Sequence, residues 1–413
     1  MKNIFQKFKR KKNLSLLLLF CGLHSLFLIF ISLWLVNQHI IYGDERILFQ
    51  VTSGIKKIIL GIENKPNPND YIFINNSNDN MLIDKLDEEG LPFGNQPITD
   101  RRKLAFLFER INKRPDNYKY IVCDIFFKDP SQYDSILNSK ISNTKNIIIP
   151  YHFNDSGSVD LPFLNINKGL ADYQSIQYVF MKFRLSGPDT IKSLPLKMYE
   201  DISGKRFVQN GVFPLLDGYP CFNTIFIDFK LRYYELINRN AELMYNIVNL
   251  GDLLKMNDSV FYKAINNKII LIGDYYERDI HQTLFGKMSG TLILLNVFLT
   301  LQNRENLISA ALVLLLFVCF FTISLELFSK KSLGERKYIA KYSQRKLGKF
   351  VLKYLSYVLY LTILSVATYF IFNIHLNILI LAVYMKSVDS LIKFLRLRKN
   401  KKLNIKKEEK NEN

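Results

Sequence analysis

Four long apolar runs interrupt a chain in which apolar and polar positions otherwise alternate over short distances. The runs cover residues 14–36, 307–328, 350–372 and 374–392. Each approaches the roughly 20 residues that an α-helix needs to cross a hydrocarbon core of about 30 Å. Only the residues around Asn373 separate the last two runs, which favours a tight helical hairpin. The pattern therefore predicts an α-helical membrane region of four spans.

The segment between the first two runs, residues 37–306, has the pattern of an α/β domain. Short apolar runs rich in Ile, Val, Phe and Tyr, typical of strands covered on both faces, occur at 70–75, 118–127, 146–151, 223–229 and 267–274. Between them, residues 100–113 place apolar side chains at helical spacing behind Asp100 as N-cap, and residues 130–141 begin a helix with a proline. Alternating strands and helices predict a mainly parallel sheet with flanking helices.

The last predicted strand leads into a helical segment, 288–306, that ends only a few residues before the second span. A nearly continuous helical connection between the α/β domain and the membrane is therefore expected. A rearrangement at the end of the final strand would reach the bilayer through such a connection, whereas a long disordered linker would absorb it.

The formal net charge of +19 lies beside the apolar runs and not on the α/β segment. Six Lys/Arg and no acid occur in residues 1–13, nine against one acid in 329–353, and ten against four in 386–413. Basic charge on alternate connections is the positive-inside pattern. It predicts a cytoplasmic N-tail (1–13), loop (329–349) and C-tail (393–413), an outward-facing domain at 37–306, and a signal anchor in the cell (inner) membrane.

This distribution also argues against nucleic acid as a partner, because the outward segment carries almost no net charge. The basic tail suits an anionic membrane leaflet, although topology alone would explain its charge.

The four cysteines predict little chemistry. Cys21 and Cys319 lie inside predicted spans. Cys123 and Cys221 have two interpretations: a disulfide in an oxidising compartment, or free thiols that pack as small apolar side chains. Their spacing does not resemble a zinc site, and no metal or cofactor is expected.

No phosphate-binding loop, dinucleotide fingerprint, zinc-protease motif or nucleophile elbow occurs in the sequence. Polar candidates gather instead at the carboxyl ends of the predicted strands, where ligands collect in open parallel sheets. They are Asn75, Asn76, Asp124, Asp129, Asp274, Asp279 and His281. Acids and a histidine could hold a divalent cation or act as an acid–base pair, but the same residue types routinely end strands and cap helices. Both interpretations stay open.

Arg184 is a further candidate, in a stretch where Lys and Arg alternate with apolar residues. It is interpreted either as the solvated face of an exposed strand or as the partner of an anion or carboxylate inside the domain.

Over roughly residues 40–305, these segments resemble the CHASE2 family of extracytoplasmic sensor domains. Residues 96–111 match the family's opening helix through Pro97, Arg101 or Arg102, and Ala105, and residues 118–137 match its second strand through Asp124 and the helix containing Asp134. The strongest match, residues 267–296, has Gly273, Asp279, Thr283, Gly286, Gly290 and Asn296 in the family's order and spacing.

The chain departs from the family pattern at several positions. Asn75 and Asn76 stand where the family tends to have acids, and Leu294 stands where a histidine commonly lies. The central segment matches only through Gly169, Asp172 and Arg184. The kinase or cyclase that typically follows such sensors is not found in this sequence.

The resemblance implies a membrane-anchored extracytoplasmic sensor module that binds a ligand or an envelope partner and relays a signal to a separate protein. The expected ligand-binding candidates are Asp124, Asp274, Asp279, His281, Thr283 and Arg184, and no catalytic residue is expected. A membrane scaffold without a ligand is the alternative, and a metal-dependent envelope enzyme is the third hypothesis.

Overall fold

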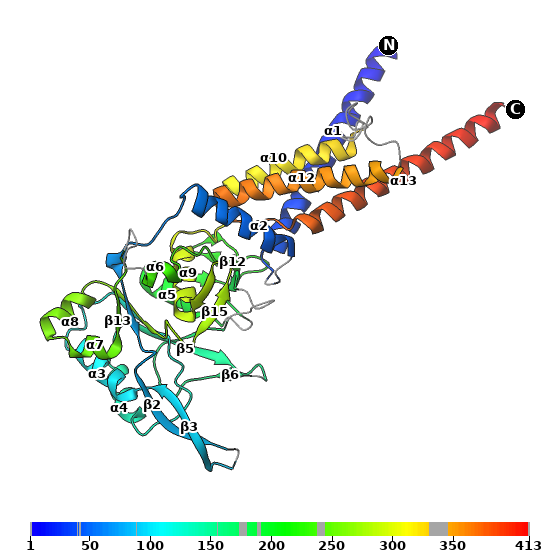
Figure 1. The fold of residues 1–413 in the computed structure, drawn as a ribbon. Helices are drawn as coiled ribbons and strands as arrows, with labels where there is room; N and C mark the ends of the chain where they lie inside the picture. The colour runs from blue at the N-terminus through cyan, green and yellow to red at the C-terminus, as the bar shows by residue number, and fades with distance from the viewer. Residues whose placement is uncertain are drawn as a thin grey trace. The chain divides into compact units, whose positions relative to one another are not determined.

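The computed structural model describes residues 2–38, 40, 43–87, 89–154, 156–172, 180–187, 191–237, 244–329 and 346–411. They form two compact units (Figure 1). The α/β unit is Gly61–Leu307, and the helical unit combines Met1–Leu60 with Ile308–Asn413. Residues 330–345 of the predicted basic loop lie outside the described residues.

The α/β unit contains the strands of the described residues and the shorter helices. Its strands are β1 (Tyr71–Asn75), β2 (Asn80–Leu86), β3 (Pro92–Thr99), β4 (Tyr120–Cys123), β5 (Ile147–Phe153), β6 (Val159–Asp160), β7 (Lys168–Leu170), β8 (Lys182–Arg184), β9 (Phe207–Val208), β10 (Leu215–Leu216), β11 (Tyr219–Pro220), β12 (Thr224–Phe226), β13 (Ile247–Asn249), β14 (Ile269–Gly273), β15 (Ile280–Thr283) and β16 (Gly286–Ser289). Its helices are η2 (Pro68–Asp70), α3 (Arg101–Asn112), α4 (Asp134–Ile141), α5 (Leu194–Ser203), α6 (Tyr233–Ile237), α7 (Leu250–Lys255), α8 (Asp258–Ile265) and α9 (Gly290–Gln302).

The central sheet has the strand order β13-β1-β14-β4-β5-β6, and β7 pairs with the far part of β5. All of these pairings are parallel except that of β6. Every residue of β1, β4 and β14 is buried, as the unbroken apolar runs predict. The predicted mainly parallel sheet with flanking helices is confirmed.

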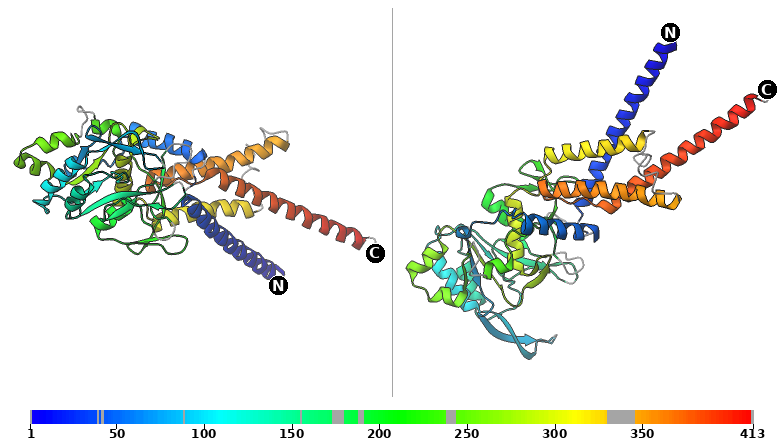
Figure 2. Two further views of the ribbon diagram at one scale, coloured as in Figure 1. Left: turned by 90° about the horizontal axis from the view of Figure 1, so that it is seen from below. Right: turned by 45° about the horizontal axis from the view of Figure 1, so that its top comes forward.

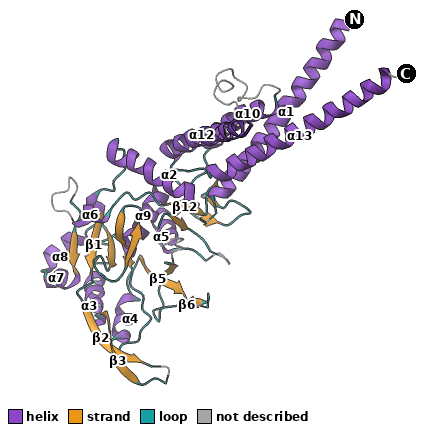
Figure 3. Ribbon diagram, turned by 45° about the vertical axis from the view of Figure 1, so that its right-hand side comes forward, coloured by secondary structure: helices purple, strands orange, loops and turns teal. Residues whose placement is uncertain are grey.

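Helices cover both faces of this sheet (Figure 3). One face packs against α3, α4, α7 and α8, and the apolar side chains predicted for the first helix, such as Leu104 and Phe108, are fully buried there. On the other face, α9 contacts β14, and α5 contacts β5. Asp100 caps α3, since its side chain accepts hydrogen bonds from the backbone N–H groups of Arg102 and Lys103.

Shorter sheets surround the central one. The hairpin β2–β3 extends away from it (Figure 2), and β15–β16 form a second hairpin before α9. The strand predicted at 223–229 forms only as β12, and it pairs with β8 in a separate antiparallel pair instead of joining the central sheet. An isolated apolar run carries no information about its partner strand, which is why the sequence did not reveal this.

The helical unit consists of α1 (Lys2–Val36), α2 (Gly43–Gly54), the π-helix η1 (Ile55–Ile59), α10 (Ala310–Phe328), α12 (Lys346–Phe372) and α13 (Ile378–Asn411). Three helical segments among the described residues are long and apolar enough to cross a membrane: Leu14–Val36, Ala310–Phe328 and Leu355–Phe372.

The fourth predicted span, 374–392, is not among these three segments. The turn of the predicted hairpin occupies residues 373–377, with Asn373 at a positive φ of 58°. The helix that follows, α13, carries Lys386, Asp389 and Lys393 in its first half and continues to Asn411. Charge at this density distinguishes α13 from the three apolar helices.

The connection from α9 to α10 is not a continuous helix, contrary to the expectation. It turns at Arg304, which has a φ of 57°. Two contacts hold this turn to the α/β unit: Lys230 Nζ lies 2.6 Å from Glu305 Oε1, and the Phe222 N–H donates to the Asn306 carbonyl. Residues 303–309 therefore link the two units by an anchored turn.

Candidate functional site

The carboxyl ends of three neighbouring parallel strands bring polar residues from distant parts of the sequence together. Asn75 pairs with Gly273, and Ile272 pairs with Cys123, so the residues that follow these strands meet at one edge of the sheet. A cavity of about 220 Å³, which we call the strand-end pocket, lies at this edge. Its lining residues are Asn76, Asn80, Pro97, Ile98, Thr99, Arg101, Asp124, Ile125, Phe126, Asp129, Asp274 and Arg278.

Arg101, in the first turn of α3, is the most unusual lining residue because its cationic side chain is only 1% exposed. The guanidinium carbon lies 4.5 Å from the centre of the Phe127 ring, and Nε lies 3.5 Å from Asp134 Oδ1. Burial lowers the pKa of Arg101, although the charge of Asp134 opposes this effect. An arginine nevertheless stays protonated in proteins, so the pocket contains a fixed positive charge.

The hydrogen-bonding capacity of Arg101 is not met by the described part of the chain. Nε and Nη1 are buried and have no hydrogen-bond acceptor there. The Oδ1 atom of Asn76, a residue that is 4% exposed, likewise has no donor among the described residues. A buried polar group without a partner costs about 1–3 kcal/mol, and more when it is charged. Donors and an acceptor at the same pocket are therefore available to a polar ligand.

Asp124, directly after β4, contributes a carboxylate to the same pocket. Its Oδ2 atom accepts a hydrogen bond of 2.8 Å from Thr291 Oγ1, in the first turn of α9. Burial and, secondly, the nearby charge of Asp279 raise the pKa of Asp124 from an ordinary 3.8 to about 7. The carboxylate thus exchanges its proton near neutral pH while it links the pocket to α9.

Asp274, directly after β14, lines the pocket but also builds the turn that follows it. One carboxylate oxygen accepts from the backbone N–H groups of Tyr276 and Glu277 at 2.9 Å, and the other accepts from that of Arg278 at 3.2 Å. Both oxygens are therefore engaged in the turn, as the interpretation of this aspartate as a structural cap requires.

Asp279 and His281 are near this site but do not line the strand-end pocket. His281 Nε2 lies 2.7 Å from Asp279 Oδ1. A second pair, His152 and Asp172, has the same separation between Nδ1 and Oδ1. Burial disfavours protonation of His152, but the hydrogen bond to Asp172 and its charge outweigh burial and raise the pKa of His152. These two pairs and the carboxylate after β4 form a cluster of interacting titratable groups.

Thr283 and Arg184 lie elsewhere in the α/β unit. The Thr283 hydroxyl donates to the Gly286 carbonyl and accepts from the Phe285 N–H, so it shapes the turn of the β15–β16 hairpin. Arg184 is half-buried at the end of β8, and its Nε donates to the backbone carbonyl of Ser186 at 2.9 Å. Neither residue reaches the strand-end pocket.

The glycines singled out from the sequence permit close packing around α9. A methyl group on Gly273 would collide with Thr291, and one on Gly290 would collide with the carboxylate of Asp279. Gly286 has a φ of 94°, which favours glycine in the hairpin turn.

Three further pattern residues have distinct roles. Asn296 accepts from the Leu231 N–H and donates to its carbonyl, which satisfies two backbone groups in the interior. Ala105 is buried in the core, and Pro97 lines the pocket. Of the two neighbouring arginines, Arg101 is the pocket residue, whereas the side chain of Arg102 is 60% exposed and pairs with Asp100.

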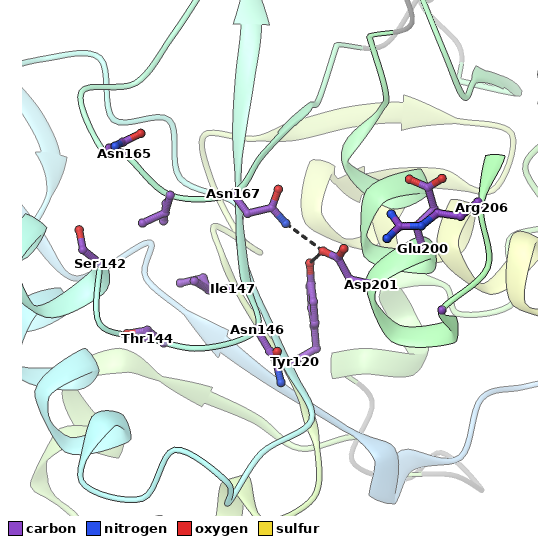
Figure 4. Close-up of a pocket in the computed structure, with 12 residues that line it drawn as sticks. Tyr120, Ser142, Thr144, Asn146, Ile147, Asn165, Asn167, Glu200, Asp201 and Arg206 are labelled. Carbon is purple, nitrogen blue, oxygen red and sulfur yellow. Dashed lines mark hydrogen bonds between the residues drawn. The ribbon is translucent and has the colours of Figure 1, made fainter. Parts of the chain in front are cut away.

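A second cavity, of about 540 Å³, lies near the amino ends of β4 and β5 (Figure 4). At its edge Tyr120 and Asn167 both donate to Asp201 Oδ2, at 2.6 and 2.8 Å. The carboxylate is thus engaged by protein donors, and none of the described side chains that line this cavity has a buried unpaired atom.

Metal ligands do not gather at either cavity. Among the described residues, no three His, Cys, Asp or Glu side chains are grouped so that they could hold a metal ion. All four cysteines are free, and Cys123 and Cys221 are both fully buried.

A scan against protein-family models matches the CHASE2 domain over residues 65–325. The chain belongs to the CHASE2 family. The match includes every residue of the strand-end pocket, and CHASE2 domains are extracytoplasmic sensor domains. Comparison with curated proteins and with solved structures returned no match.

Sequence reasoning found part of the strand-end pocket and missed part of it. It placed Asp124 and Asp274 at the strand ends, but it named Arg101 only as a position of the family pattern, with Arg102 as the alternative. The signal that could have separated this residue from Arg102 is its position on the α3 face that carries Leu104 and Phe108. Nothing in the sequence pointed to His152, because its partner is 20 residues away in an irregular segment.

Proposed function

We propose that this chain is a membrane-anchored sensor module whose strand-end pocket binds a small polar ligand and whose helices relay binding to a separate protein. The buried guanidinium of Arg101, with two donors that no described residue satisfies, is the observation that carries this proposal. Asp134 lies 3.5 Å from Nε and offsets the charge, but the two buried N–H donors have no hydrogen-bond acceptor among the described residues, which is costly.

The pocket has a direct physical link to the segment that enters the membrane region. Asp124 accepts a hydrogen bond from Thr291 at the start of α9, and Thr291 packs against Gly273 at the end of β14. The other end of α9 leads through residues 303–309 into α10. A ligand that binds one arrangement of the α9 start more tightly than another would shift the population of that arrangement.

The membrane anchor in this proposal follows from the apolar helices and the basic segments beside them. With the N-tail and the 329–349 loop cytoplasmic, the α/β unit faces outward from the cell membrane. The basic loop is then the surface available to a signalling partner in the cytoplasm.

The experiment that tests ligand binding is native mass spectrometry of the full-length chain, released from its membrane in mild detergent. Arg101→Gln removes the buried charge, and Arg102→Gln is the matched control, because it removes a neighbouring exposed charge. We expect a small-molecule adduct on the unsubstituted chain and on Arg102→Gln that is lost from Arg101→Gln. An adduct of equal occupancy on all three proteins, or on none of them, would contradict the proposal.

A further inference from the structure

The charges that line the strand-end pocket have both signs, and this limits the ligands that fit. Arg101 supplies a buried positive charge, while Asp124 and Asp129 supply partly buried carboxylates. Three backbone N–H groups of its turn donate to Asp274, and Arg278 is exposed, with Nη1 donating to a backbone carbonyl. Asp134 lies 3.5 Å from Nε of Arg101 and offsets part of its charge, so a ligand meets both N–H donors of cations and carboxylates in this lining.

A ligand of a single charge suits this lining poorly. A simple anion would satisfy Arg101 but would lie close to the carboxylates, and a simple cation would face a guanidinium that cannot lose its proton. In a small pocket of reduced dielectric, such like-charge contacts cost several kcal/mol. A ligand that carries both charges on neighbouring groups, separated by a single carbon atom, satisfies both sides of the pocket.

The size of the cavity limits the ligand further. At about 30 Å³ for each water molecule in the liquid, the volume of about 220 Å³ corresponds to roughly seven waters. This space accommodates a small molecule of the size of glycine, alanine or serine.

We propose that the strand-end pocket binds a small zwitterion of the amino-acid class, with its carboxylate on Arg101 and its ammonium facing Asp124 and Asp129. The unpaired Asn76 Oδ1 is an additional acceptor for the ammonium. This inference rests on the proposed function, because it names the chemistry of the ligand at the same site.

The test measures the melting temperature of the full-length chain in detergent with four probes: glycine, L-alanine, acetate and ethylammonium. We expect the two amino acids to raise the melting temperature and the two singly charged probes to have little effect. Arg101→Gln should weaken amino-acid binding at least about tenfold, since a hydrogen bond to a charged group contributes about 1.5–3 kcal/mol. Arg102→Gln should leave binding unchanged.

Asp129→Asn is a second test variant, which does not replace a fully buried side chain as Arg101→Gln does. The Asp129 side chain is partly exposed and interacts with Arg101 through its charge, so the substitution should spare the fold while weakening amino-acid binding. Stabilisation by acetate equal to that by glycine, and dependent on Arg101, would overturn the zwitterion but leave a ligand pocket. No response to any probe, together with no adduct in native mass spectrometry, would overturn the proposed function as well.

A second and independent observation concerns the helix α2 and the π-helix η1 in the helical unit. Their exposed face is apolar: Ile47, Val51, Ile58 and Ile59 are 67%, 53%, 72% and 73% exposed. Spacings of four and seven residues place the first three on one side of the helix.

The opposite face of the same segment is polar and buried. Thr52 Oγ1 lies 3.0 Å from His375 Nε2, and Lys56 Nζ donates to Asn373 Oδ1. The carboxylate of Asp44 accepts from the Leu379 N–H at 3.0 Å. Thus α2 and η1 pack on α12 and α13 mainly through polar side chains, with Phe49 against Tyr369 as the apolar contact, and direct most of their apolar side chains outward. A helix in water has the reverse arrangement, so water is a poor medium for this face.

We infer that lipid acyl chains cover the apolar face of α2 and η1. The segment belongs to the same compact unit as the three apolar helices, and its partners lie at the turn between α12 and α13. Residues 43–59 therefore lie in the membrane beside this turn, whereas the sequence placed them in the outward domain.

Spin labels provide the test, in the full-length chain with Cys319→Ala and reconstituted in bilayers. Labels at Ile47→Cys and Ile58→Cys should be relaxed by oxygen, which enters the bilayer, more than by a polar nickel complex. The opposite ranking is expected at Ser156→Cys, an exposed position of the α/β unit. Preferential relaxation by nickel at Ile47 and Ile58 would overturn the inference, and so would protection from both reagents, which would indicate a protein partner.

Discussion

The clearest energetic consequence of the site concerns Asp124, whose ionisation the fold opposes. Its pKa is about 7 in the folded chain against an ordinary 3.8, because of burial and the charge of Asp279. Between these two values the folded state binds the proton more tightly than the unfolded state, so stability falls as the pH rises. Each pKa unit corresponds to 1.36 kcal/mol, and the ionised carboxylate therefore destabilises the α/β unit by about 4 kcal/mol above pH 7.

Asp124→Asn removes this charge and keeps an oxygen that can accept the Thr291 hydrogen bond. We expect the variant to melt at a higher temperature at pH 8, by roughly 8–16 °C if the full 4 kcal/mol is realised. The difference should shrink as the pH falls and be nearly absent at pH 4. The control Asp116→Asn removes the same charge from a side chain that is 91% exposed, and it should change little at either pH.

The assay follows unfolding of the α/β unit with dithiodipyridine, which reacts with thiols in acid because its pyridine nitrogens are protonated there, and which detects the buried Cys123 and Cys221. The two other cysteines are replaced by alanine in all proteins compared. Tryptophan fluorescence would not serve, because the single tryptophan, Trp34, lies in α1 of the helical unit. A lower melting temperature for Asp124→Asn at pH 8, or a gain that is equal at pH 4 and pH 8, would refute the reasoning.

Three further predictions concern the packing around this site, and the same thiol assay measures them. Gly290→Ala should lower the unfolding free energy by about 1–3 kcal/mol because its methyl group collides with a carboxylate, whereas Gly187→Ala, with its nearest neighbour at 3.9 Å, should have little effect. Asn296→Leu leaves two buried backbone groups unpaired and should cost about 2–4 kcal/mol; an unchanged melting temperature would contradict this. Asp172→Asn should destabilise the chain more at pH 5 than at pH 9. Because the pKa of His152 is raised, its pair with Asp172 stabilises the folded chain fully below about pH 6.5, and this stabilisation disappears as the pH rises; an equal loss of stability at both pH values would refute this.

The elements of the central sheet were predictable because each strand is buried on both faces, so its sequence is an unbroken apolar run. The same reasoning failed for β12, whose apolar run is equally plain but whose partner is β8. Strand pairing depends on contacts between distant segments, which a run of apolar residues does not encode. The α9–α10 connection was predicted as nearly continuous helix. It is instead held in a turn by contacts with residues distant in sequence, such as that of Glu305 with Lys230.

The candidate site could be predicted where polar residues directly follow the strands of the parallel sheet. The aspartates after β4 and β14 were found because a parallel sheet directs its carboxyl ends to one edge. Arg101 was missed as a pocket residue because a cation on an apolar helix face is indistinguishable, in sequence, from a surface arginine whose stem covers the core. The membrane face of α2 was missed because charged and polar residues interrupt its apolar ones, and only its packing shows that the polar residues point inward.

The measurement that tests the central claim most directly is in-cell crosslinking of the tagged full-length chain, followed by mass spectrometry of the proteins recovered with it. The unsubstituted chain, Arg101→Gln and Arg102→Gln are compared at equal abundance. If the strand-end pocket controls a relay through the membrane, a cytoplasmic signalling protein will be recovered with the unsubstituted chain and with Arg102→Gln, and its recovery will change with Arg101→Gln. Recovery of the same envelope proteins in the same amounts with all three chains would contradict the account and identify a scaffold instead.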